Sequence, residues 1–244
     1  TTLAPGCYQD MFSSTGLTTA PELPATELAP QCYMMMFNDC PSLTVAPELP
    51  ATTLVYGCYD SMFSSCTSLT IAPELPATTL AEACYLFMFS GCTSLNYVKC
   101  LATDISADYC TISWLDDVAP EGTFVKDADM NDWEIEPRDG AVWGIPEGWT
   151  VNAILKCNSD GEGNYWATFY NDASYTADAN ATVYTAHANS DKTKAILTKV
   201  ADNVIPATNA VLLKSTTANV FMTYTDGASG TLEDNELQGT STPI

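Results

Sequence analysis

Basic side chains are scarce in this chain of 244 residues, which carries 8 Lys and Arg against 30 Asp and Glu and has a formal net charge of −22 at pH 7. A charge of this sign repels polyanions, so it argues against nucleic acid and against an anionic membrane surface as partners. The chain also lacks an apolar run of about 18 residues, the length that a membrane-spanning helix needs. We therefore expect no nucleic-acid partner and no transmembrane segment.

The motifs of common catalytic and metal sites are missing as well. His187 is the single histidine, and there is no GxSxG, no HExxH and no phosphate-binding glycine loop. The absence of a CxxC pair argues against a zinc site. With so many acids, some carboxylates must lie close together, so paired carboxylates are weak evidence for a glycosidase. The sequence predicts no catalytic residues, no metal and no cofactor.

What the chain does contain is an internal repeat. Cys32, Cys58, Cys84 and Cys110 follow one another at intervals of 26 residues, and Cys7 precedes them by 25. A copy of this size is too small to bury a core of its own, so consecutive copies must stack side by side. The period predicts an array over residues 1–118, made of four copies and a degenerate fifth.

Each copy divides into two halves. Positions i, i+4 and i+8 of the CYxxMFxxC block fall on one face of a helix, so this block predicts a short helix that faces inward. The LTxAPELPAT block that follows predicts a short strand and turn. The predicted core consists of the repeated inner positions of three copies: Cys32, Met36, Phe37, Cys40, Cys58, Met62, Phe63, Cys66, Cys84, Met88, Phe89 and Cys92.

The remainder of the chain differs in composition. Residues 119–150 hold three tryptophans and a run of acids, and we interpret them as a C-terminal cap and connector. Residues 151–244 are rich in Thr, Val, Ala, Asn and Asp, with short alternating runs between turn residues. This pattern predicts a small all-β, sandwich-like domain.

The repeat LxxxCYxxMFxxCxSLTxAPELPAT resembles the BspA-like leucine-rich repeats of surface proteins from Bacteroides-type gut bacteria. VKCLATDISADYC, GTFVK and GIPEGWTV resemble the segment that closes such arrays, and YWATFYND and IPATNAVLLKST resemble a small β domain that follows them. The resemblance implies an α+β leucine-rich-repeat solenoid with one short strand and one short helix in each 26-residue rung. It also implies an extracellular or cell-surface protein, secreted or lipid-anchored, whose export signal lies outside the printed sequence.

Two groups of residues are candidate ligand-binding sites. Glu22, Glu48 and Glu74 occupy one repeat position, so stacking aligns them in a column that could recruit Ca²⁺, a cationic partner or a glycan. The alternative is a solvated edge, since exposed charges repel only weakly in water. The next copy of this position holds Cys100. Tyr165 and Trp166 could form an aromatic platform for a sugar, although such residues in a strand more often belong to a core.

The cysteines also allow two interpretations. Most of the cysteines fall in two repeat columns at core positions, and one of these columns has Thr15 and Val118 in place of cysteine, which indicates small buried residues with reduced thiols. Cys100 and Cys157 lie outside both columns and are the better candidates for a disulfide or a reactive thiol. Asn158, Asp160, Glu162 and Asn164 superficially resemble a calcium loop, but the glycine is misplaced, and a β-turn is favoured.

The function expected from these observations is non-catalytic recognition or adhesion, with an extracellular protein or glycan bound by the repeat array. Constant inner positions and variable outer positions of the repeat are the basis for it. A carbohydrate-active enzyme or a polysaccharide-utilisation accessory protein is an alternative, and a structural stalk or spacer is another.

Overall fold

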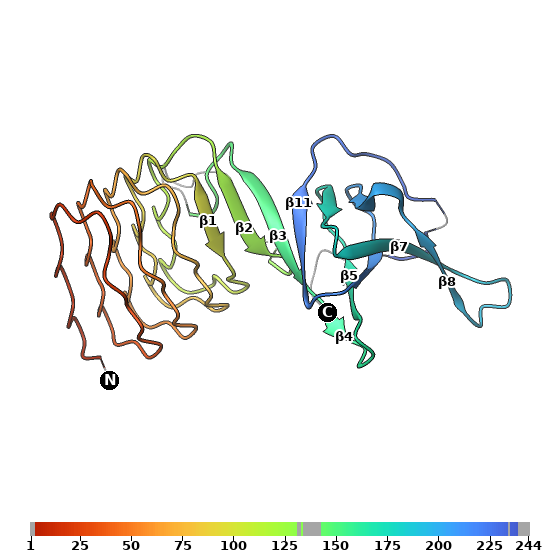
Figure 1. The fold of residues 1–244 in the computed structure, drawn as a ribbon, viewed down its shortest axis with the longest axis horizontal. Coiled ribbons are helices and arrows are strands. Elements are labelled where there is room, and N and C mark those ends of the chain that lie inside the picture. Colours follow the sequence, from red (N-terminus) through yellow and green to blue (C-terminus); the bar gives the residue numbers. More distant parts are fainter. Residues whose placement is uncertain (1–2, 131–132, 134–142, 234, 239–244) are drawn as a thin grey trace. The chain divides into compact units, whose positions relative to one another are not determined.

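The computed structural model describes residues 3–130, 133, 143–233 and 235–238. It divides into two compact units. The N-terminal unit is formed by Thr1–Lys126 and Asp132–Thr150, and the C-terminal unit by Asp127–Asn131 and Val151–Ile244. Figure 1 shows the 26-residue copies of the N-terminal unit as rungs that lie side by side up to strand β1 (Tyr97–Cys100).

The prediction of an α+β leucine-rich-repeat solenoid is wrong. No α-helix occurs in the described residues, and the single helical element is the 3₁₀ turn η1, Ala201–Asn203. The described strands instead form two sheets, of six and five strands. No helix among the described residues has the length and apolar character that a membrane span requires.

The CYxxMFxxC block of each rung is a ribbon of successive four-residue turns. In the second rung, the amide N–H groups of Cys32 and Met34 donate to carbonyl oxygens three residues earlier, at 3.1 and 3.2 Å. Every fourth residue has a positive φ, as at Gln31 (55°), Met35 (55°) and Asp39 (54°). A left-handed residue cannot continue a right-handed α-helix, so it ends each turn and starts the next.

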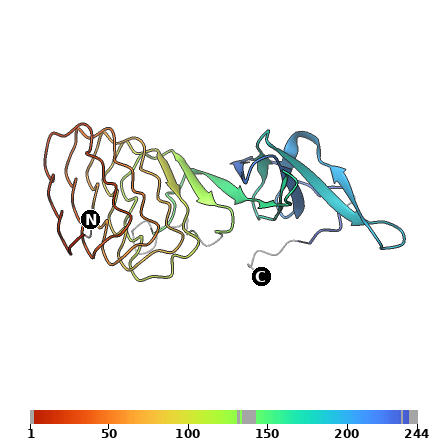
Figure 2. The ribbon, with the colours of Figure 1, turned by 60° about the horizontal axis from the view of Figure 1, so that its bottom comes forward.

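The remaining amides of the ribbon pair with the next rung. Gln31 donates its N–H to the carbonyl oxygen of Tyr56 (3.0 Å), and Tyr33 donates to Cys58 (3.1 Å). The pattern recurs between later rungs, as from Tyr59 to Cys84 (3.2 Å). Figure 2 shows the rungs lying side by side. Because alternate N–H groups bond outside the rung, the ribbon is fixed by its neighbours rather than by a helical ladder.

A four-residue turn explains why the helix was predicted. It returns side chains to the same direction every fourth residue, as one face of a helix approximately does, so i, i+4 and i+8 are compatible with both. The inward residues come as adjacent pairs, such as Cys32 with Tyr33 and Met36 with Phe37, and all four are buried. The strict period of four, rather than the 3.6 of an α-helix, was the sequence signal that could have indicated successive turns instead of a helix.

Equivalent side chains of successive rungs form continuous columns in the core. The rings of Phe37, Phe63 and Phe89 are stacked with centroids 5.6 Å apart. Tyr33, Tyr59 and Tyr85 form a second stack beside them, with centroids 6.0 and 6.2 Å apart. The twelve residues predicted to form the core are all buried: Cys32, Met36, Phe37, Cys40, Cys58, Met62, Phe63, Cys66, Cys84, Met88, Phe89 and Cys92.

The LTxAPELPAT half of each rung runs extended but pairs only at single residues. Isolated parallel bridges join Thr19 to Val45 and Ile71 to Tyr97. Proline has no N–H to donate, and the two prolines of APELP therefore prevent a continuous ladder. Regular pairing begins where proline is absent: β1 (Tyr97–Cys100) pairs in parallel with β2 (Thr123–Asp127).

Tryptophans close the last rung of the N-terminal unit. Trp114 continues the tyrosine column, with its ring 6.1 Å from that of Tyr85. Trp133 stacks on Trp114 at 5.4 Å and meets Phe124 edge-on. The indole N–H of Trp149 donates to the carbonyl oxygen of Ala119 (2.8 Å). Trp114 and Trp133 therefore extend the stack of aromatic rings beyond the repeats.

The C-terminal unit contains antiparallel strands around one core. In one sheet β3 pairs with β11, β11 with β6 and β6 with β9, while the other sheet has the order β4-β5-β10-β7-β8. The core includes Leu155, Val183, Leu213 and Met222. The strands are β3 Thr150–Lys156, β4 Asn158–Ser159, β5 Tyr165–Phe169, β6 Tyr175–Ala177, β7 Ala181–Ala188, β8 Ala195–Lys199, β9 Val204–Ile205, β10 Val211–Ser215 and β11 Asn219–Tyr224.

Candidate binding surface

The structure aligns Glu22, Glu48 and Glu74 on the extended halves of successive rungs, and all three are exposed. The next member of this column is Lys99, whose Nζ lies 2.9 Å from Oε2 of Glu74. The expectation that Cys100 follows in this position is wrong. Leu75 bridges to Cys100, because the register between these two rungs is one residue shorter than the repeat, and Cys100 therefore enters the leucine column.

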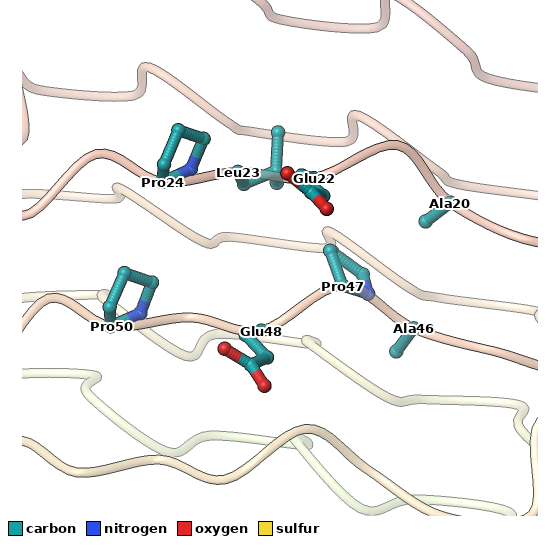
Figure 3. Close-up of a pocket in the computed structure, with 8 residues that line it drawn as sticks. All are labelled: Ala20, Glu22, Leu23, Pro24, Ala46, Pro47, Glu48 and Pro50. Carbon is teal, nitrogen blue, oxygen red and sulfur yellow. The ribbon is translucent and has the colours of Figure 1, made fainter.

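A shallow groove of about 410 Å³ lies between the first two rungs at this column. Figure 3 shows that equivalent residues lie over one another along it: Ala20 over Ala46, Glu22 over Glu48, and Pro24 over Pro50. The prolines and alanines give the groove apolar walls, and the two carboxylates supply its charge. It can hold an extended chain or a small cationic group.

An exposed apolar column runs beside the acidic one. Val45 and Ile71 occupy one repeat position and are 54% and 59% exposed. The same position holds Thr19 in the first rung and Tyr97 in β1, and single bridges join Thr19 to Val45 and Ile71 to Tyr97. We call the surface formed by Val45, Glu48, Ile71, Glu74 and the groove the strand face. The apolar column was not predicted, although LTVAPELP and LTIAPELP place a branched aliphatic residue at one position of two copies.

The strand face carries charge of one sign up to its last rung. Residues 3–98 contain no Lys or Arg, and Lys99 is the first basic residue of the chain. The ammonium group of Lys99 on Glu74 neutralises the end of the column only. Cationic groups are therefore attracted to the strand face from Glu22 to Glu48, and anionic groups are repelled.

Tyr165 and Trp166 do not form one platform. They are neighbours on β5, so their side chains point to opposite faces of the sheet. Tyr165 packs against the core of the C-terminal unit. On the other face, Nζ of Lys214 lies 5.3 Å from the ring centroid of Trp166, and the ring of Tyr184 lies 6.4 Å away.

The carboxylate of Asp160 organises the turn that superficially resembles a calcium loop. Its Oδ1 accepts the N–H groups of Glu162 (2.8 Å) and Asn164 (3.1 Å), and its Oδ2 accepts the side-chain amide of Asn164 (2.8 Å) and the indole N–H of Trp166 (3.2 Å). The amide of Glu162 and then the side chain of Asn164 lower the pKa of Asp160 to about 2. Both carboxylate oxygens of Asp160 therefore accept hydrogen bonds from the turn and from Trp166. Nowhere in the described ranges do three His, Cys, Asp or Glu residues meet in a cluster able to hold a metal.

All ten cysteines are free thiols, and Cys7 alone is exposed. The thiols of Cys40, Cys66 and Cys92 donate to the carbonyl oxygens of Phe12, Phe37 and Phe63 at 3.0, 3.1 and 3.0 Å. This column is therefore a row of weak hydrogen-bond donors as well as a row of small apolar side chains. Cys100 and Cys157, the candidates for a disulfide or a reactive thiol, are both free and buried.

The thiols are expected to react with a thiol reagent in two classes. Burial raises the pKa of Cys58, Cys66 and Cys100 to about 12, so the reactive thiolate is rare at neutral pH and access is blocked. At pH 8 the folded protein should show one fast thiol, Cys7, and the unfolded protein all ten. Ellman's reagent with and without denaturant measures both counts. A Cys7→Ser variant should lose the fast phase, and several fast thiols in that variant would contradict the buried columns.

Comparison of the chain with protein-family models, with curated proteins and with solved structures finds no match in any of the three. With no relative to supply a function, the chemistry of the strand face is the observation from which a function is inferred.

Proposed function

We propose that the N-terminal unit is a non-catalytic recognition module that binds an extracellular protein through the strand face. The observation that carries this proposal is the register of exposed Val45 and Ile71 with exposed Glu48 and Glu74. Apolar side chains flanked by charged ones are typical of protein-binding surfaces, because the apolar part supplies affinity and the charges supply specificity. The resemblance of the repeat to surface proteins supports an extracellular partner.

The backbone beneath this surface favours binding. Hydrogen bonds hold neighbouring extended segments in register, from Thr44 N–H to the Thr18 carbonyl (2.9 Å) between the first two rungs and from Ala72 N–H to the Tyr97 carbonyl (3.0 Å) between the third rung and β1. A surface that is already ordered loses little conformational entropy when a partner binds. The partner should present basic side chains next to an apolar patch, since the strand face offers the complements of both.

The test is a binding screen of the intact chain against extracellular proteins and against a glycan array. We expect a protein ligand whose affinity falls about tenfold or more when Val45 and Ile71 are both replaced by Ser, as for central interface residues. Glu22→Gln with Glu48→Gln should weaken binding and reduce its dependence on salt.

Tyr56→Ser is the matched control, because Tyr56 is an exposed apolar residue (48%) outside the strand face. The affinity of this variant for the protein ligand should stay within about twofold of that of the unmodified protein, because the substituted residue contributes little to binding. Silence across both screens at high protein concentration would contradict the proposal. Binding of glycans alone would also contradict it, because it would assign the array to carbohydrate recognition.

A further inference from the structure

Strand β8 (Ala195–Lys199) leaves one edge of the five-stranded sheet open. It is the last strand in the order β4-β5-β10-β7-β8, and within the described ranges its only neighbour is β7. All five of its residues are exposed, including Ile196 (43%) and Leu197 (40%). An edge with exposed apolar side chains and unpaired backbone groups is a template for a further strand.

The register shows which backbone groups are unpaired. Asn189 donates its N–H to the Lys194 carbonyl (2.9 Å), and Val200 donates to Val183 (2.9 Å), so even-numbered residues from 194 to 200 direct their backbone groups at β7. Hydrogen-bonding direction alternates along an antiparallel strand. The N–H and carbonyl groups of Ala195, Leu197 and Lys199 therefore point to the open edge.

This hairpin is also a basic segment in an acidic protein. Lys192, Lys194 and Lys199 are three of the eight basic residues of the chain. Lys99 pairs with Glu74 and Lys156 with Asp127, whereas no carboxylate of the described ranges forms an ion pair with any of these three lysines. The positive charge of the hairpin is available to an acidic partner.

The other edge of the hairpin already holds an acidic residue of the chain itself. Glu236 donates its backbone N–H to the carbonyl of Ala186 (2.8 Å), and Oε2 of Glu236 accepts the N–H of Ala188 (2.8 Å). Lys192 and Lys194 line the hollow of about 350 Å³ beside this contact. The hairpin thus shows, on its β7 side, the kind of contact that the open β8 side can make.

We propose that β8 is a docking edge for an acidic, extended peptide segment of another protein, which adds to the sheet as a further strand. Backbone hydrogen bonds to Ala195, Leu197 and Lys199 give the register, and lysines on both faces of the hairpin, Lys199 on one and Lys194 on the other, select for acidic side chains. A second copy of this chain fits the edge poorly. Antiparallel pairing of β8 with itself brings Lys199 of one copy close to Lys194 of the other, and these like charges repel. The two copies also repel each other as a whole, because each has a net charge of −22.

The test uses the intact chain and a synthetic peptide of about seven residues with Glu at alternate positions and Thr or Val between them. Titration followed by amide hydrogen exchange should show new protection at Ala195, Leu197 and Lys199. Amides at Ile196 and Thr198, already paired with β7, should change little. A peptide with Lys in place of Glu should bind at least about tenfold more weakly. Added salt should weaken the binding of the acidic peptide.

Leu197→Pro is the decisive variant, because proline removes an N–H that faces the open edge and leaves the bonds to β7 in place. This variant should bind the acidic peptide about tenfold or more weakly than the unmodified protein. Leu197→Ala, which keeps the N–H, should lower the affinity about threefold or less. If Leu197→Pro does not fold, the exchange pattern of the unmodified protein decides.

Three results would overturn the proposal. They are equal binding of the acidic and basic peptides, protection without Ala195, Leu197 and Lys199, and unchanged affinity in a folded Leu197→Pro variant. Sedimentation showing a dimer that Leu197→Pro dissociates would assign the edge to a second copy and overturn it as well. The strand-face variants at Val45 and Ile71 should leave peptide binding unchanged, so this test is independent of the function proposed for the rungs.

Discussion

Replacing Phe63 by Ala is expected to lower the free energy of unfolding of the N-terminal unit by about 3–5 kcal/mol. The Phe63 ring is fully buried, and it stacks between Phe37 and Phe89 with both centroids at 5.6 Å. Its removal leaves a cavity that neither neighbouring rung can fill, because their backbones are tied together by the hydrogen bonds of the ribbon. Urea or thermal unfolding followed by circular dichroism measures the loss.

Phe12→Ala is the matched control for this variant. Phe12 belongs to the same column in the first rung, but it is only half-buried and stacks on a single described ring, that of Phe37 at 5.7 Å. Its replacement should cost half as much or less, since fewer contacts are lost and solvent can enter the space. Equal losses at Phe12 and Phe63 would contradict a core in which each rung is stabilised by a neighbour on both sides.

The same nearest-neighbour stacking explains which parts of the fold the sequence could predict. The 26-residue spacing of Cys32, Cys58 and Cys84 correctly places their side chains in one column, because repetition alone fixes which residues are equivalent. It says nothing of the backbone between them. Whether the amide of Tyr33 bonds within the rung or to Cys58 depends on the neighbouring rung, and helix propensity is silent on that choice.

The prediction that Cys100 follows Glu74 in the acidic column failed for a related reason. Counting 26 residues from Glu74 leads to Cys100, whereas the structure places Lys99 there, since one residue is lost from the register between these rungs. A period cannot show where it slips. Lys99, the only basic residue near the column, was the sequence signal for the slip, because a lysine next to a row of carboxylates is electrostatically more favourable than a thiol.

In the C-terminal unit, the limit was the direction of side chains on one strand. Tyr165 and Trp166 are adjacent in the sequence, and adjacency suggested a common platform. Alternation along β5 instead sends Tyr165 to the core and Trp166 to the face where Lys214 and Tyr184 lie. The strand itself was visible in the sequence, but which of its faces met the core depended on partners distant in the chain.

Replacing Gly122 by Ala should destabilise the closing segment of the N-terminal unit by about 3 kcal/mol, at the upper end of the usual cost of overpacking. A Cβ atom at this position would lie 2.6 Å from Cε2 of Trp149 and 2.7 Å from the carbonyl oxygen of Asn96. Neither can withdraw freely. The Asn96 carbonyl accepts the N–H of Thr123 (2.8 Å), and the Trp149 indole N–H donates to Ala119 (2.8 Å).

The cost of the Gly122 substitution is steric rather than conformational, which a second glycine can demonstrate. Gly16 has no atom within 4 Å of an added Cβ, and neither glycine has a positive φ. Gly16→Ala should therefore leave stability unchanged or raise it by a few tenths of a kcal/mol through the unfolded chain. Gly122→Ala should also disturb the near-ultraviolet circular dichroism of the tryptophans, because the Trp149 ring must move or Thr123 must give up its bond to Asn96. If both variants unfold at the same denaturant concentration as the unmodified protein, the close approach of Trp149 to the backbone at Gly122 is not a feature of the folded chain.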